Sequence, residues 1–73
     1  MRVAVVGLGN AGFDLHLPAL AGLPGITAIG VDPDSARRDR AAAQHKVPVA
    51  ESLDAALASG PLDAVVVATP PGS

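Results

Sequence analysis

Short runs of β-branched residues alternate with stretches of helical apolar spacing along the whole 73-residue chain. We expect strands at residues 2–6, 26–31, 47–49 and 62–68, and helices at residues 11–23, 34–45 and 53–58. Because a helix separates each strand from the next, the strands should be parallel and joined by right-handed crossovers. The pattern predicts an α/β fold: the first half of a doubly wound Rossmann parallel sheet, with strand order 3-2-1-4 and helices on both faces.

Prolines and capping residues refine this prediction. Pro18 falls inside the first expected helix, where it removes a backbone donor, so we expect a kink near Leu17. Pro48 falls inside the third expected strand and places it at a sheet edge, because proline cannot donate to a ladder. Asp34 or the serine after it is expected to cap the second helix, and Ser52 the third.

The segment Gly7-Leu8-Gly9-Asn10-Ala11-Gly12 lies between the first expected strand and the first expected helix. In a dinucleotide-binding loop the first glycine allows the tight turn, the second lets the backbone approach the pyrophosphate, and the third lets the helix pack on the strand. Free amides around Asn10 and Ala11 would face the phosphates with the positive end of the helix dipole. The candidate cofactor ligands here are Gly7, Gly9, Asn10, Ala11 and Gly12. The alternative is a tight turn that binds nothing.

Asp32 ends the second expected strand, 20 residues after Gly12. A carboxylate there accepts hydrogen bonds from the adenosine ribose hydroxyls and repels a 2'-phosphate, which favours NAD over NADP. Arg37 is a further candidate, for contact with adenine or a 2'-phosphate; an exposed helix arginine is an equal alternative. Thr69 and Pro70 follow the fourth strand at the ligand-binding edge of such sheets, either lining the nicotinamide half of the cleft or merely ending the strand.

Composition argues against several other classes of protein. A formal net charge of −2 with only 5 basic residues argues against a nucleic-acid-binding face. The chain has no cysteine for a disulfide or thiolate metal site, and its histidines and acids lack metal-ligand spacing. No apolar run approaches the length of about 18 residues that a membrane span needs. We therefore expect a cytoplasmic protein without metal, membrane or nucleic-acid partners.

The fourth expected strand lacks the features that protect natural sheet edges. Residues 64–68 are uninterrupted apolar residues, with no charge or proline to discourage pairing with another chain. We therefore expect the chain to be the amino-terminal part of a longer protein, or to pair with another polypeptide. Poor solubility of the isolated 73 residues would support this expectation, and a stable monomer in sedimentation would contradict it.

Residues 3–12, His16-Leu-Pro-Ala-Leu20, Asp32-Pro-Asp34 and Ala68-Thr-Pro-Pro71 follow one another in a specific order and spacing. Together they resemble the start of the glucose-fructose oxidoreductase, inositol dehydrogenase and MocA family. The resemblance implies that the glycine loop, Asp32 and Thr69-Pro70 hold NAD or NADP. It also implies that the complete protein oxidises or reduces a sugar, cyclitol or related small molecule, and is consistent with a homo-oligomer.

The catalytic residues of this family have no counterpart in the chain. The family's Glu-Lys-Pro motif and its catalytic histidine lie beyond the segment that corresponds to Ser73. His16, His45 and Lys46 are interpreted as structural, the last two because cations complement a helix end. Residues 1–73 are thus interpreted as a partial NAD(P)-binding Rossmann domain without the substrate domain.

Two alternative functions stay open at this point. A noncatalytic NAD(H)-binding or sensing module needs the same glycine loop and acid as the oxidoreductase. A fragment of an S-adenosylmethionine-dependent methyltransferase also has a glycine turn and an acid, but its usual Gly-x-Gly-x-Gly turn matches residues 7–12 less well.

Overall fold

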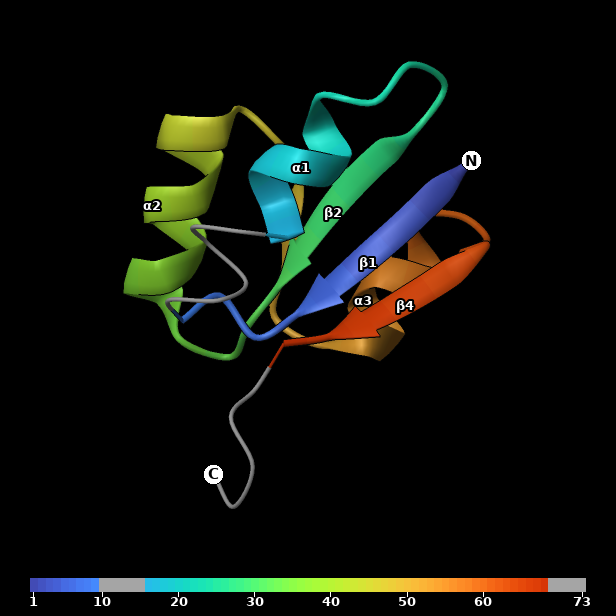
Figure 1. Cartoon of the computed structure of the whole chain (residues 1–73). Helices are drawn as coiled ribbons and strands as arrows, with labels where there is room; N and C mark the ends of the chain where they lie inside the picture. Colours follow the sequence, from blue (N-terminus) through green and yellow to red (C-terminus); the bar gives the residue numbers. More distant parts are fainter. Residues whose placement is uncertain (10–15, 69–73) are drawn as a thin grey trace.

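The computed structural model of the chain describes residues 1–9 and 16–68. Its elements are β1 (Arg2–Val6), α1 (Leu17–Ala21), β2 (Thr27–Val31), α2 (Ser35–His45), β3 (Val49–Ala50), α3 (Leu53–Ala58) and β4 (Ala64–Val67). All four strands form one parallel sheet in the order β3-β2-β1-β4. In Figure 1, α1 lies in front of this sheet and α3 behind it, and α2, drawn to the left of α1, packs on the same side of the sheet as α1. The predicted fold class and strand order are confirmed.

The central strand β1 is apolar at successive positions because both of its faces are covered. It pairs with β2 on one side and β4 on the other. Since side chains alternate across a strand, Val5 contributes to one apolar cluster and Ala4 to another, and both are fully buried. A strand covered on both faces reads as a continuous apolar run, as β1 does.

The two clusters contain only aliphatic side chains among the described residues. The front cluster, on the α1 and α2 side, consists of Val5, Leu8, Leu17, Ala28 and Ala41. The rear cluster, on the α3 side, consists of Ala4, Ile29, Val31 and Ala56. Because Leu8 belongs to the glycine loop as well as to the front cluster, the loop is packed directly against the core.

Both capping predictions are confirmed. The carboxylate of Asp34 caps α2 by accepting from the backbone N–H of Ala36 at 2.9 Å and of Arg37 at 3.4 Å. The hydroxyl of Ser52 caps α3 by accepting from the backbone N–H of Ala55 at 3.1 Å. Each short polar side chain satisfies amides that the first turn of a helix leaves unpaired.

The end of the first helix and the start of the third strand differ from the prediction. α1 ends at Ala21, so Leu23 lies outside the helix and is 49% exposed instead of buried. β3 begins at Val49, and Pro48 precedes it, although its carbonyl accepts from the N–H of Gly30 at 2.9 Å. The edge position of β3 is confirmed, since it pairs with β2 alone among the described strands.

Pro18 occupies the first turn of the described helix α1. The helix start expected at residue 11 lies among residues 10–15, outside the described residues. The kink expected near Leu17 therefore stays a prediction.

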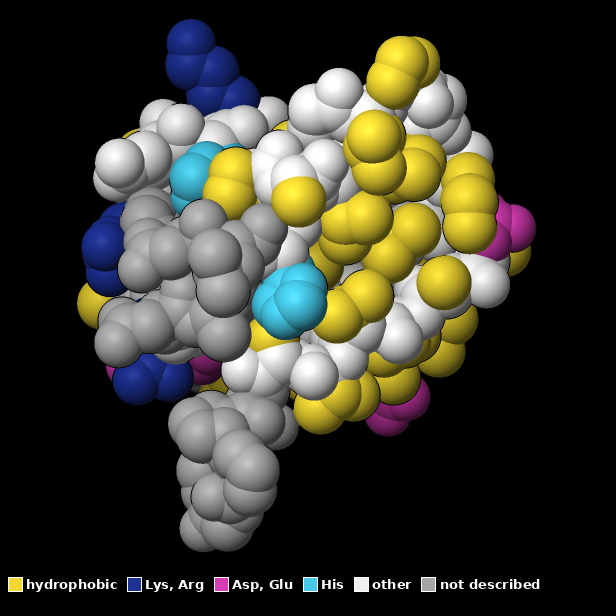
Figure 2. Space-filling view, in the orientation of Figure 1, with side chains coloured by type: hydrophobic (Ala, Val, Ile, Leu, Met, Phe, Trp, Pro, Cys, Tyr) yellow, Lys and Arg dark blue, Asp and Glu magenta, His cyan; other side chains and the backbone are white. Residues whose placement is uncertain are grey.

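The β4 strand is poorly covered within the described part of the chain. Val65 and Val67 are 44% and 68% exposed, whereas Ala64 and Val66 between them are half-buried. On the side turned to the viewer in Figure 2, further apolar side chains gather where β1 and β4 lie. This exposure agrees with the unprotected sequence of the strand, and its covering by another segment or chain stays a prediction.

Candidate functional site

The glycine loop begins where β1 ends, at the carboxyl edge of the sheet (Figure 1). Gly7 is buried and has a φ of 97°, a backbone conformation that residues with a Cβ rarely adopt. Its N–H donates to the carbonyl of Val31 at 2.8 Å, which extends the pairing between the loop and β2. Gly7 therefore makes the tight turn that the sequence predicted at this position.

Leu8 ties the loop to the rest of the fold through its side chain and its backbone. The side chain is 2% exposed and packs in the front cluster. The backbone N–H donates to Oδ2 of Asp32 at 2.8 Å, across 24 positions of sequence. The loop is thus fixed directly beside the end of β2.

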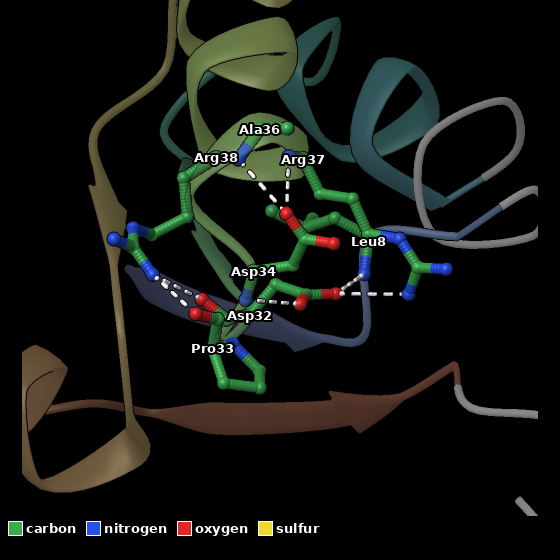
Figure 3. A network of polar contacts seen from close by, with 7 residues as sticks. All are labelled: Leu8, Asp32, Pro33, Asp34, Ala36, Arg37 and Arg38. Atoms are coloured by element: carbon green, nitrogen blue, oxygen red, sulfur yellow. Dashed lines mark hydrogen bonds and ion pairs between the residues drawn. The ribbon is translucent and has the colours of Figure 1, made fainter.

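Asp32 follows β2 at the same edge of the sheet and is 3% exposed. Its Oδ2 accepts from the N–H of Leu8, and its Oδ1 accepts from the N–H of Asp34 at 2.9 Å (Figure 3). A buried carboxylate is tolerated only when hydrogen bonds or an opposite charge replace its water. Both oxygens of Asp32 have such a donor.

The ionisation of Asp32 follows from these contacts. Burial raises the pKa of the carboxyl, but hydrogen bonds from the backbone N–H groups of Leu8 and Asp34 and the nearby Arg37 guanidinium outweigh it. The net effect is a pKa below the usual value of an aspartate. Asp32 is therefore a charged acceptor at neutral pH, as the recognition of ribose hydroxyls requires.

Two successive arginines in the first turn of α2 point to opposite sides of Asp32 (Figure 3). Arg37 places Nη1 at 3.6 Å from Oδ2 of Asp32, and its side chain is 54% exposed. Arg38 instead donates from Nη1 to the carbonyls of Asp32 and Pro33, both at 2.9 Å. Arg37 therefore lies beside the carboxylate, whereas Arg38 holds the backbone of the turn that carries it.

The arginine beside the carboxylate also reaches the glycine loop. Among the described residues, the atom nearest to a Cβ built on Gly9 would be Nη1 of Arg37, at 4.0 Å. The absence of a side chain at Gly9 thus leaves the loop backbone accessible next to a positive charge. Such a combination suits an anionic ligand.

The structure brings four of the predicted site residues together at the carboxyl edge: Gly7, Gly9, Asp32 and Arg37. The other predicted ligands lie outside the described residues: Asn10, Ala11, Gly12, Thr69 and Pro70. β4 ends at the same edge, where the N–H of Ala68 donates to the carbonyl of Val6 at 2.8 Å.

Sequence reasoning missed the roles of Leu8 and Arg38. An apolar residue between two glycines signals that the loop packs into a core, and this could have identified Leu8. No comparable signal exists for Arg38, because only the positions of the carbonyls of Asp32 and Pro33 distinguish it from Arg37.

Neither a candidate metal site nor a candidate membrane span is present among residues 1–9 and 16–68. No group of three or more histidine, cysteine, aspartate or glutamate side chains within these ranges could hold a metal ion. None of the helices in this part of the chain combines the length and hydropathy needed to cross a membrane.

A family model described as "Oxidoreductase family, NAD-binding Rossmann fold" matches residues 1–73. The chain belongs to the GFO_IDH_MocA family. The resemblance seen in the sequence is thereby confirmed, and a nicotinamide dinucleotide is supported as the cofactor. Membership of an oxidoreductase family also argues against the S-adenosylmethionine-dependent methyltransferase that the sequence left open. No curated protein matches the sequence significantly.

Solved structures share the fold of this GFO_IDH_MocA chain. A protein assigned as a dehydrogenase from Bordetella bronchiseptica RB50 is 31% identical, with a TM-score of 0.79. A myo-inositol dehydrogenase from Corynebacterium glutamicum ATCC 13032 is 25% identical, with a TM-score of 0.78. A Gfo/Idh/MocA oxidoreductase from Vibrio cholerae is 22% identical, also with a TM-score of 0.78, and shows the fold alone.

The alignments differ in how much of each protein they include. Each covers 96% of this GFO_IDH_MocA chain but only 19%, 21% and 22% of the three solved chains, respectively. The chain therefore spans about a fifth of the length of these relatives.

Proposed function

We propose that residues 1–73 bind NAD as the cofactor-binding part of an oxidoreductase that transfers hydride to or from a sugar, cyclitol or related small molecule. The observation that carries this proposal is the hydrogen bond of 2.8 Å between Oδ2 of Asp32 and the N–H of Leu8. It holds an ionised acceptor for ribose beside the loop that would receive the pyrophosphate. The likeness to a myo-inositol dehydrogenase supports a polyhydroxylated substrate.

The residues present fit a dinucleotide in both shape and donor chemistry. Gly9 carries no side chain of its own, which lets a pyrophosphate approach the loop backbone, and Nη1 of Arg37 lies 4.0 Å from the position that a Cβ would take. A carboxylate has about four lone-pair positions, and the backbone donors of Leu8 and Asp34 use one on each oxygen of Asp32. Acceptor capacity is therefore left for the ribose hydroxyls once the exposed side chain of Arg37 moves aside.

In this proposal, the described residues bind and orient the cofactor without taking part in proton transfer. When bound, the nicotinamide ring supplies or accepts the hydride. His16 precedes α1, and His45 and Lys46 end α2, so the described positions of all three suit a structural role. We propose that the catalytic acid or base lies outside residues 1–73.

Ligand titrations followed by turnover assays test the proposal. Separate titrations with NADH, NADPH and S-adenosylmethionine should give the tightest binding for NADH. Tightest binding of S-adenosylmethionine would overturn the proposed cofactor. Reduction of NAD by the full protein with a panel of sugars and cyclitols then distinguishes an oxidoreductase from a sensing module, which would bind NADH without turnover.

Replacement of Arg37 by alanine is expected to separate the two dinucleotides. A 2'-phosphate at this site would take a charge-assisted hydrogen bond from Arg37, so its loss should weaken NADPH binding by about 10- to 100-fold. NADH affinity should change much less, because its ribose hydroxyls bind Asp32. Fluorescence titration with both cofactors measures the two effects.

The matched control for this prediction is Arg40→Ala, which removes the same charge from an exposed position of the same helix. It should leave the ratio of NADPH to NADH affinity unchanged. Equal weakening of NADPH binding in the Arg37 and Arg40 variants would mean that only the overall charge matters.

A further inference from the structure

A glycine occupies the interior of β2, where no turn requires one. Gly30 is buried and lies in register with Val5 of β1 and Val49 of β3. Glycine weakens a strand, and in a strand interior it often marks a place where another group approaches the backbone closely. In β2, the space that a side chain of residue 30 would take is therefore expected to hold another group.

The group above Gly30 is the side chain of Leu8. A Cβ built on Gly30 would lie 3.1 Å from both Cδ1 and Cδ2 of Leu8, and 3.4 Å from Cγ1 of Val49. A contact of 3.1 Å is closer than carbon atoms normally pack, so one of the partners would have to shift.

Leu8 has little room in which to shift. Its side chain is 2% exposed and is enclosed by the front cluster, which includes Val5, Leu17 and Ala41. Protein interiors are packed too densely to absorb an added methyl group without displacement. The contact requires a shift of a few tenths of an ångström, and we expect it to be passed to the backbone of Leu8, which is part of the glycine loop.

The backbone of Leu8 is also bound from β2, by Asp32, which lies two positions after Gly30. Residues 30 and 32 lie on the same face of β2 and its extension, because side chains alternate along a strand. Gly30 receives the side chain of Leu8, and Asp32 accepts its N–H at 2.8 Å. The loop is thus located by one steric contact and one charged hydrogen bond, both from β2.

We propose that Gly30 is a positioning residue for cofactor binding: its missing side chain sets the height of the glycine loop above β2 and so keeps the Leu8 amide on the Asp32 carboxylate. The inference rests on the proposed binding of a dinucleotide to this loop. Gly30 itself touches no cofactor, and it acts through Leu8.

The variant Gly30→Ala should lift Leu8 and lengthen its hydrogen bond to Asp32. NADH affinity should fall about tenfold, because a displaced loop no longer presents its amides beside the Asp32 carboxylate in the arrangement that the cofactor needs. The double variant Gly30→Ala with Leu8→Val should recover most of this loss, because valine has no δ-carbons to collide with the new methyl group. Gly22→Ala, at the end of α1 and with a negative φ of −82°, is the matched control and should bind NADH normally.

The pH profile of NADH binding provides a readout that a general loss of stability would not move. The N–H of Leu8 favours the ionised form of Asp32, so a weaker bond raises the pKa of this carboxyl. The acid limb of NADH affinity should therefore shift to higher pH in Gly30→Ala and return in the double variant. Normal NADH binding by Gly30→Ala, or failure of Leu8→Val to compensate, would overturn the proposal.

If Gly30→Ala does not fold, the double variant is tested in its place. A double variant that folds and binds NADH supports the proposal, and a double variant that does not fold refutes the proposal. If the unmodified protein does not bind NADH, the proposed function fails. The positioning role is then judged without a ligand, from the NMR shift of the Leu8 amide and the titration of Asp32 in Gly30→Ala.

Discussion

Replacement of Asp32 by alanine is expected to give the largest loss of NADH binding of any single change in the described site. The variant removes the acceptor for the ribose hydroxyls and releases the amide of Leu8 that helps to locate the loop. It also leaves the amides of Leu8 and Asp34 without their acceptor, which should lower the free energy of unfolding by about 2–4 kcal/mol. Calorimetry with NADH and denaturant unfolding measure the two losses.

Asp39→Ala is the control for this prediction, because it removes an exposed carboxylate from α2. Its effect on stability should stay within about 0.5 kcal/mol, as for most surface substitutions. If the Asp32→Ala variant binds NADH nearly as tightly as the unmodified protein, Asp32 does not contact the ribose.

The pH dependence of stability gives an independent measure of the same carboxylate. A carboxyl group with a lowered pKa in the folded state stabilises the fold above its unfolded pKa, and this contribution is lost as the pH falls through the folded value. The unmodified protein should therefore be more stable than Asp32→Asn at pH 7, and the difference should shrink below about pH 4. A difference that stays constant between these pH values would mean that Asp32 does not stabilise the fold through its charge.

Replacement of Gly7 by valine is expected to give the second large loss of NADH binding. Gly7 has a φ of 97° and is buried, so a β-branched residue there is strained and has little space. Backbone strain of this kind costs about 1–3 kcal/mol, and the loop can relieve it only by abandoning the tight turn. If the misaligned loop loses about 2–3 kcal/mol of binding free energy, NADH affinity falls by about 30- to 150-fold.

Gly22→Val provides the matched control for the Gly7 variant. Gly22 has a φ of −82°, which any residue can adopt, and it is exposed at the end of α1. The Gly22→Val variant should therefore bind NADH with unchanged affinity in the same titration. Normal NADH binding by Gly7→Val would refute the requirement for a glycine-only turn.

The apolar surface of β4 bears on how these experiments are performed. Val65 and Val67 are exposed, and the solved relatives are about five times longer than this chain. Since exposed apolar strands at a sheet edge recruit other chains, binding measurements should be accompanied by a test of the oligomeric state.

The order of the elements, the strand order and the caps of α2 and α3 were all predictable from the sequence. These features depend on local or repeating properties: apolar periodicity, the turn preference of Gly7, and the ability of Asp34 and Ser52 to bond nearby amides. The ends of α1 and β3 were not predictable to the residue, because packing and a few hydrogen bonds decide where such short elements stop.

The sequence by itself placed a glycine loop after β1 and an acid after β2, which is enough to predict a dinucleotide-binding half of a Rossmann sheet. Only the tertiary structure decided how the two meet. The amide of Leu8 and the carboxylate of Asp32 are 24 positions apart, and they form a hydrogen bond because parallel pairing of β1 with β2 brings both strand ends to one edge. The same packing gives Gly30 a reason to be glycine and separates the tasks of Arg37 and Arg38, since each depends on contacts made between segments distant in the sequence.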